Sequence, residues 1–184
     1  MREYDKAFYT TLAHTARRSA QYIAPIVLAY IKPKSIVDVG CGTGTWLSVF
    51  AENGITDFLG IDGDFVPQDA LEIPADRYVS FDLTRTYNSM RRFDLVVSLE
   101  VAEHLPTQWA GFFRSSGSCD LARRCCFPRT IPGQGGTHHV NEQWQDYWAN
   151  LFLRHDYVPI DDLGKRGGRL VVRPKYTSLL LLEL

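Results

Sequence analysis

Three glycines at alternate positions, with an acid just before them, are the residues whose spacing points most directly to chemistry. The segment Ile36–Leu47 runs from apolar residues through Asp38 into Gly40, Gly42 and Gly44, and then returns to helix-like sequence. This order predicts a buried strand, a tight turn and the start of a helix. Glycine has no Cβ to hold a ligand away from the main chain, and the first amides of a helix face whatever binds there. The segment therefore predicts a loop that binds a nucleotide cofactor.

The spacing of this loop distinguishes two kinds of cofactor. A dinucleotide loop has the form G-x-G-x-x-G, whereas here the third glycine, Gly44, comes one place early and Thr45 follows it. Asp38 lies two residues before Gly40, where a carboxylate would repel a pyrophosphate and attract an ammonium group. S-adenosylmethionine carries an ammonium group, a sulfonium and an adenosine. At this point the sequence resembles the class I S-adenosylmethionine-dependent methyltransferases, whose first motif has the form acid-x-Gly-x-Gly-x-Gly.

Further acids lie at or near the ends of later apolar segments. Asp62 ends a short apolar stretch 22 residues after Gly40 (62 − 40), which suits a carboxylate that accepts hydrogen bonds from ribose hydroxyls. Asp82 ends the next stretch, and Glu100 lies in the almost continuous apolar run Phe93–Val101. Each acid alone would most often be a solvated loop residue, but their joint order and spacing favour a cofactor site.

The resemblance implies which residues hold the cofactor. In the family, the acid after the third strand meets the adenine amino group, its neighbour packs on the ring, and the end of the fourth strand closes the pocket. Carried onto this sequence, the cofactor-binding residues are Asp38, Gly40, Cys41, Gly42, Thr43, Gly44, Asp62, Gly63, Asp82, Leu83, Glu100 and Val101.

Two histidines are candidate catalytic residues. Methyl transfer from a sulfonium needs a positioned nucleophile and removal of a proton where one must leave. His104 follows the fourth predicted strand and His139 lies in a glycine-rich loop, so either could serve as general base, or each could be a structural or exposed histidine. A metal site from His104, His138, His139 and Glu142 lacks a ligand spacing such as H-E-x-x-H, so no metal is expected.

The elements that position these residues follow from hydrophobic periodicity. Residues 4–31 have the spacing of two helices that end before Pro33, and residues 1–32 are expected to form a helical cap. Strand, helix and strand then alternate as far as Val101. This alternation predicts an α/β fold with a Rossmann-like, doubly wound, mostly parallel sheet and helices on both faces. One further helix is predicted to start within Thr107–Phe113, and another is predicted over Trp144–Phe152.

Two segments do not fit this plan. A fifth buried strand is due after residue 113, but residues 114–130 are polar, basic and not strand-like. Over residues 4–113 and 131–160 the sequence resembles one bacterial subgroup of these methyltransferases. That resemblance implies a final Trp-Trp-Tyr-x-Gln-Asn strand, and Leu170–Tyr176 stands in its place. One-base shifts of possible codons restore both expected patterns. We therefore predict frame slips within residues 114–130 and 161–184 that would compromise the fifth strand and the C-terminal hairpin; reading the coding DNA would test this.

Length and composition set the broad class. The 184 residues suit one α/β domain, expected to span residues 1–184. A net charge of −1 gives no reason to expect a nucleic-acid partner. No opening signal peptide or membrane-spanning run is visible, so a cytoplasmic protein without a membrane partner is expected. The four cysteines include no C-x-x-C pair, which argues against a zinc site.

Together the residues and the resemblance predict methyl transfer from S-adenosyl-L-methionine to a small-molecule or saccharide-type acceptor. The acceptor, the attacking atom and the oligomeric state do not follow from the sequence. One alternative is a non-catalytic or damaged S-adenosylmethionine-binding protein, which the unusual residues 114–130 favour. A dinucleotide-dependent oxidoreductase is a third possibility, and Thr45 argues against it because a dinucleotide loop needs its third glycine later.

Overall fold

The computed structural model describes residues 6–85, 87, 91–105, 124–128, 132–133, 139–154, 158–160 and 179–183. The chain divides into two compact units. The first comprises residues 1–83 and 93–95, and the second comprises residues 84–92 and 96–184. The boundary between them falls inside strand β4 (Leu95–Val97).

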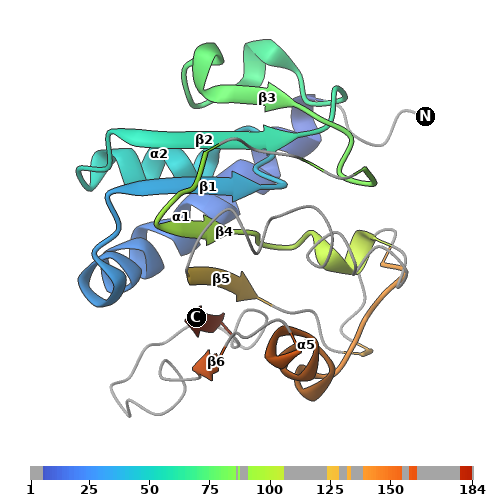
Figure 1. Ribbon diagram of the computed structural model, residues 1–184. Helices are drawn as coiled ribbons and strands as arrows, with labels where there is room; N and C mark the ends of the chain where they lie inside the picture. The colour runs from blue at the N-terminus through green and yellow to red at the C-terminus, as the bar shows by residue number, and fades with distance from the viewer. Residues whose placement is uncertain are drawn as a thin grey trace. The chain divides into compact units, whose positions relative to one another are not determined.

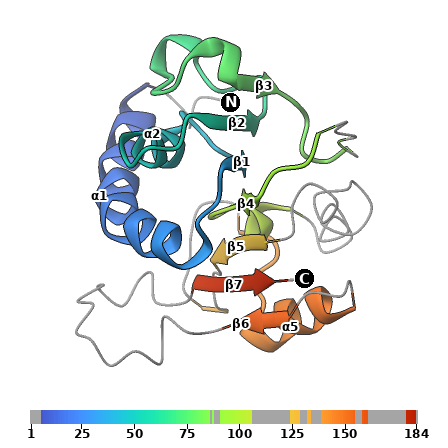
Figure 2. The ribbon, with the colours of Figure 1, turned by 60° about the vertical axis from the view of Figure 1, so that its left-hand side comes forward.

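One long helix, α1 (Lys6–Ile31), replaces the two helices predicted for residues 4–31. Pro25 lies inside it and removes one backbone N–H from the helical ladder, which costs about 3 kcal/mol in a helix interior. Burial of a continuous apolar face offsets this cost. Helix α1 packs against α2 (Thr45–Glu52), as Figure 2 shows. The buried face of α1 has helical spacing, and its members are each at most 8% exposed: Ala20, Ala24, Val27 and Ile31.

Three parallel strands form the sheet of the first unit, in the order β3-β2-β1 (Figure 1). They are β1 (Ser35–Val39), β2 (Asp57–Asp62) and β3 (Tyr78–Ser80). All five residues of β1 are buried, as expected of a parallel strand covered on both faces. Because β2 ends at Asp62 opposite Ser80 of β3, the carboxyl ends of the strands meet at one edge.

The connection from β2 to β3 differs from the predicted alternation of strands and helices. It contains two 3₁₀ helices, η1 (Gln68–Ala70) and η2 (Ala75–Arg77), in place of an α-helix. Pro67 and Pro74 directly precede these turns. A proline disfavours helical angles at the residue before it, so the two prolines divide the segment into pieces too short for an α-helix.

The strand order in the second unit is β4-β5-β7-β6. Strand β5 (Arg124–Pro128) runs parallel to β4, and β7 (Leu179–Glu183) runs antiparallel to both β5 and β6 (Val158–Ile160). The 3₁₀ helix η3 (Ala102–His104) follows β4. Helix α5 (Gln145–Leu153) agrees with the predicted helix at 144–152 and packs beside β6 (Figure 2).

One strand prediction for this unit is wrong, and another strand is present but shorter than predicted. Arg124–Pro128 lies in the segment predicted not to be a strand, yet it forms β5, with Cys125 opposite Val96. Strand propensity yields to tertiary context, and here two neighbouring strands supply the backbone partners. The strand predicted for Phe93–Val101 has only three residues, Leu95–Val97.

The remaining predictions for this part of the chain lie outside the described residues: those for the other residues of 114–130, the helix start at 107–113 and the segment 170–176. Within the described part of the chain, no helix combines the length and the apolar character needed to cross a bilayer.

Candidate functional site

The glycine loop connects β1 to α2 through left-handed backbone conformations. Gly40, Gly42 and Gly44 have φ values of 79°, 55° and 83°, a region that favours glycine. The Gly40 amide donates to Ile61 O at 2.7 Å, and the Gly44 amide donates to Cys41 O at 2.9 Å. These bonds fix a tight turn that ends at Gly44, the N-cap of α2.

The three glycines do not have equal space around them. A Cβ on Gly44 would lie 2.7 Å from the Ile73 side chain, whereas a Cβ on Gly42 would meet nothing within 4 Å. Gly44 is thus a packing position, and Gly42 is the point at which a ligand can approach the main chain. Gly60 of β2 plays a similar packing role, because a Cβ there would lie 2.7 Å from the Cys41 sulfur.

Asp62, at the end of β2, is bonded directly to the loop. Its Oδ2 accepts from the Gly42 amide at 2.6 Å, and its Oδ1 accepts from the Gly63 amide at 2.7 Å. Burial raises the pKa of Asp62, although the two amide hydrogen bonds act in the opposite direction. A carboxylate has about four lone-pair sites, so Asp62 can still accept hydrogen bonds from a ligand.

Asp38 supplies a second buried carboxyl group beneath the loop. It is 2% exposed, and its pKa is raised well above the ordinary value, first by burial and then by the charge of Asp62. Two buried acids of like charge favour a cationic ligand nearby. Burial also raises the pKa of the Cys41 thiol, so the thiol stays neutral. Cys41 is therefore a packing residue within the glycine loop.

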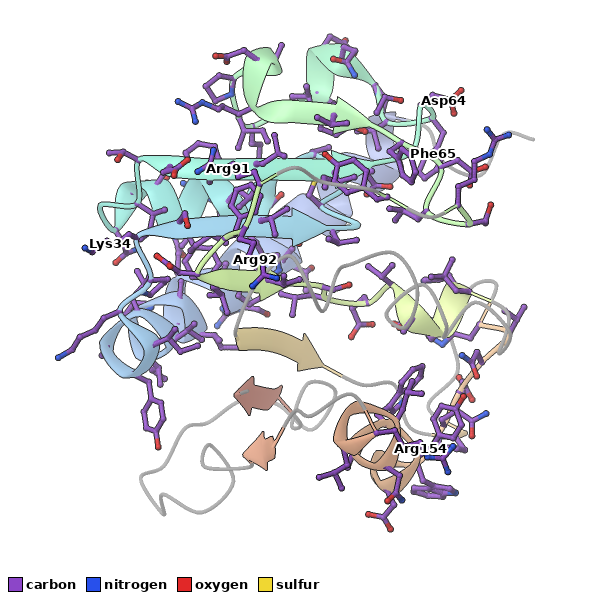
Figure 3. The ribbon with its side chains drawn as sticks, in the orientation of Figure 1. Lys34, Asp64, Phe65, Arg91, Arg92 and Arg154 are labelled. Carbon is purple, nitrogen blue, oxygen red and sulfur yellow. The ribbon has the colours of Figure 1, made fainter. Side chains whose placement is uncertain are left out.

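Gly63 and Asp82 lie at the same edge of this sheet. Gly63 O accepts from the Tyr78 hydroxyl at 2.7 Å, and the exposed Phe65 ring covers Gly63 so closely that a Cβ there would clash. Figure 3 shows Asp64 and Phe65 projecting from the loop after β2. The Phe81 amide donates to Asp62 O at 2.7 Å, which brings the segment carrying exposed Asp82 and half-buried Leu83 to this edge.

The sequence did not predict a network of polar side chains, centred on Glu72, that holds the glycine loop in place. Glu72 Oε1 accepts from Thr45 Oγ1 at 2.5 Å and from Thr43 Oγ1 at 3.4 Å, and the Glu72 amide donates to Thr43 O at 2.8 Å. Arg17 of α1 bonds Glu72 Oε2 at 3.2 Å and also pairs with Glu52. No spacing rule links these residues, because Glu72 lies far from the loop in sequence. Thr43 is therefore a loop residue whose side chain faces Glu72.

Replacing Glu72 with alanine should loosen the loop. Because two threonine hydroxyls and Arg17 lose an acceptor, we expect about 1–2 kcal/mol less stability in denaturant unfolding, together with weaker cofactor binding. Glu52→Ala is the matched control, since it removes only the exposed Arg17 ion pair and should cost within about 0.5 kcal/mol. Equal losses in the two variants would contradict the role given to Glu72.

The second unit brings the two predicted histidines together. The His104 and His139 rings meet edge to face, with centroids 4.9 Å apart. The amides of Val140 and Asn141 donate to Glu103 O at 2.8 and 3.0 Å. These bonds tie the segment before α5 to η3 and hold the two histidines in one cluster.

A carboxylate orients one of these histidines. Glu142 Oε1 lies 3.1 Å from His139 Nδ1, and Glu142 Oε2 accepts from the Gly133 amide at 3.0 Å. Such a pair fixes the tautomer of the imidazole and leaves Nε2 available as an acceptor. Among the described residues, this is an acid–histidine pair that could assist proton removal.

Glu100 and Val101 lead from β4 into this cluster. Glu100 adopts a φ of 58°, uncommon for a residue other than glycine. Part of Glu100 is solvent-exposed, but burial of its carboxyl group, followed by the nearby Glu103, raises its pKa to about 7. Val101 is 9% exposed and caps η3. The glycine-loop group belongs to the first unit, and the histidine cluster belongs to the second.

Comparison with known proteins identifies one family. The family described as "Methyltransferase domain" matches residues 11–120, more than half of the chain. This range contains the glycine loop, Asp62, Asp82, Glu100 and His104. No curated protein sequence matches the chain.

Solved structures share the fold. An O-methyltransferase family protein from Burkholderia thailandensis gives a TM-score of 0.69 at 14% identity, covering 98% of this chain and 60% of that one. Magnesium protoporphyrin IX methyltransferase (ChlM) from Synechocystis PCC 6803 gives a TM-score of 0.63 at 17% identity, and the match covers 98% of this chain and 88% of that one. Small RNA methyltransferase HEN1 gives a TM-score of 0.66 at 17% identity, and the match covers 91% of this chain and 25% of that one. These likenesses confirm the predicted Rossmann-like α/β fold.

Proposed function

The chain belongs to the methyltransferase-domain family, and on this premise we propose that it methylates a small-molecule or saccharide-type acceptor. Its methyl donor is S-adenosylmethionine. The observation that carries the proposal is the position of Asp62, whose carboxylate holds both Gly42 of the loop and Gly63 of the adjoining strand end. The ChlM structures were solved with S-adenosylhomocysteine and with S-adenosylmethionine, which supports the same donor here.

The residues of the first unit fit this donor. The buried Asp38 carboxyl suits an ammonium group, and the lone pairs left on Asp62 suit ribose hydroxyls. The open space at Gly42 lets the ligand reach the main chain. We assign Asp82 and Leu83 to the adenine. When bound, the donor supplies a methyl group on a positively charged sulfur, ready for displacement.

The histidine cluster of the second unit is assigned to the acceptor. An acceptor hydroxyl or amine must lose a proton when it takes the methyl group, and His104 and His139 are the proposed residues for this step. Glu142 supports the assignment because it holds His139 with Nε2 free to accept. Glu100 and Val101 are proposed as further cofactor-binding residues.

The net charge of −1 favours a small acceptor over a nucleic acid, although the related HEN1 structure is a small RNA methyltransferase. A cytosolic donor also leads us to propose a cytoplasmic location.

The function is tested by incubating the protein with isotopically labelled S-adenosylmethionine and a panel of hydroxyl-bearing small molecules and saccharides, with RNA as a separate arm. We expect labelled product from one small-molecule class and its loss in His104→Ala. Labelled RNA would reassign the acceptor. Donor binding without labelled product from any arm would favour the non-catalytic alternative.

Asp38→Asn should separate stability from binding. Because the folded-state pKa of Asp38 is raised, the folded protein holds this proton more tightly than the unfolded chain does. Stability is therefore lost as pH rises above the ordinary Asp value through the raised one. At pH 8 we therefore expect the unliganded variant to be more stable than the native chain, because the asparagine cannot ionise.

The same variant should bind S-adenosylhomocysteine about 10- to 100-fold more weakly, because the ammonium group loses its charged partner. Denaturant unfolding at several pH values and calorimetric titration check the two effects. Asp57→Asn, at a half-exposed ion pair of the same unit, is the matched control. An Asp38→Asn variant that is less stable at pH 8 yet binds normally would contradict the account.

A further inference from the structure

The histidine cluster contains three potential metal ligands. One ligand atom from each of Glu103, His104 and His139 lies within 4.8 Å of the other two. Glu103 and His104 lie in η3, whereas His139 lies in the segment before α5. The fold brings the three residues together, and their spacing in the sequence matches no metal-ligand motif. We propose that these three side chains bind one divalent transition-metal ion. This inference deepens the proposed function and rests on it for the ion's role toward the acceptor.

The donor set matches that class of ion. Two imidazoles and one carboxylate suit zinc, iron, cobalt or manganese, and three protein ligands leave a position open for water or substrate. Bonds of about 2.0–2.2 Å place tetrahedral ligand atoms about 3.5 Å apart. His104 is exposed, so rotation of its side chain can shorten the distances from its ring nitrogen to the ligand atoms of Glu103 and His139.

The surroundings of His139 are those of a ligating histidine. Metal-bound imidazoles usually donate their second ring nitrogen to a carboxylate, which fixes the tautomer and raises the basicity of the ligating nitrogen. Glu142 lies 3.1 Å from His139 Nδ1 and is itself held by the Gly133 amide. The nitrogen left for the ion is Nε2.

The backbone holds the ligands in place. Glu103 O accepts from the Val140 and Asn141 amides, and the Asn141 side chain donates to Ala102 O at 3.3 Å. Glu103 is 3% exposed and Asn141 is 2% exposed. A carboxylate so deeply buried is stabilised by an adjacent cation. The hydrogen bonds between η3 and the segment before α5 already hold the three ligand residues near one another.

A bound ion would change how the acceptor loses its proton. An ion with an open position can bind the oxygen of an acceptor hydroxyl and lower its pKa, so that the proton passes to solvent water. His104 and His139 would then act as ligands, and neither imidazole would need to remove the proton directly.

The site is tested on the full chain after treatment with a chelator. Cobalt(II) is added and the visible absorption followed, with calorimetric titration of zinc in parallel. We expect one ion per chain and no cobalt–thiolate band in the near ultraviolet, which sets this site apart from binding by the four cysteines. His104→Ala, at an exposed position, should weaken binding at least about 100-fold, and Glu142→Gln about 10- to 100-fold.

Asp146→Asn, at an exposed acid of α5, is the matched control and should bind the ion normally. Failure of saturable binding by the folded protein, or equal binding by His104→Ala and the native chain, would overturn the proposal. S-adenosylhomocysteine binding, measured on the same samples, shows whether the methyltransferase assignment stands independently of the ion.

Discussion

Asp62→Ala is expected to lower the affinity for S-adenosylhomocysteine by at least about 100-fold, measured by calorimetric titration. The substitution removes the acceptor of both the Gly42 and the Gly63 amides, and it removes the carboxylate proposed to bind the ribose hydroxyls. A hydrogen bond to a charged group contributes about 1.5–3 kcal/mol, and two such bonds to a ligand account for the expected loss.

The stability of the unliganded variant should fall, because the Gly42 and Gly63 amides lose their acceptor. Burial raises the pKa of Asp62, so removing a buried acid offsets part of this loss. Asp57→Ala, at the opposite end of β2 and half-exposed, should bind the ligand normally. Unchanged affinity in folded Asp62→Ala would remove this carboxylate from the site.

Gly44→Ala is expected to have the largest effect on folding. A non-glycine residue at φ 83° costs roughly 1–2 kcal/mol, and crowding a packed interior adds about 1–3 kcal/mol. Three atoms of Ile73 lie within 3.0 Å of the position of the new Cβ, so rotation of the Ile73 side chain cannot clear all of them. Denaturant unfolding should show the summed loss, and ligand binding should fall with it.

Two variants separate these costs. Gly54→Ala has a φ of 96° and no atom within 4 Å of the new Cβ, so it should show the backbone cost alone and leave binding unchanged. Ile73→Ala removes the clashing atoms, so the Gly44→Ala/Ile73→Ala double variant should lose less stability than the sum of the single variants. Strict additivity would mean that the clash contributes nothing.

The parts of the site that depend on local spacing could be predicted from the sequence. The glycine loop needs positive φ at fixed intervals, and an acid at the end of the next parallel strand must reach the same sheet edge; Gly42 and Asp62 do meet there. The Glu72 network could not be predicted, because Glu72 lies between η1 and η2 and its partners lie in the glycine loop, at the start of α2 and in α1, which no local pattern relates.

Tertiary context also explains the errors in the fold. Pro25 should divide the first helix, but burial of one face of α1 outweighs the lost hydrogen bond. Arg124–Pro128 has little strand propensity, yet β4 and β7 pair with its backbone on both sides. The frame slips remain a prediction, and codons incompatible with the shifted readings would rule them out.

Binding of S-adenosylmethionine by the loop between β1 and α2 can be measured by calorimetric titration of the native chain with S-adenosylhomocysteine and, separately, with NAD. We expect saturable binding of one S-adenosylhomocysteine per chain and no heat of binding from NAD. Binding of NAD alone, or binding of neither ligand by a chain shown to be folded, would mean that the loop does not bind S-adenosylmethionine.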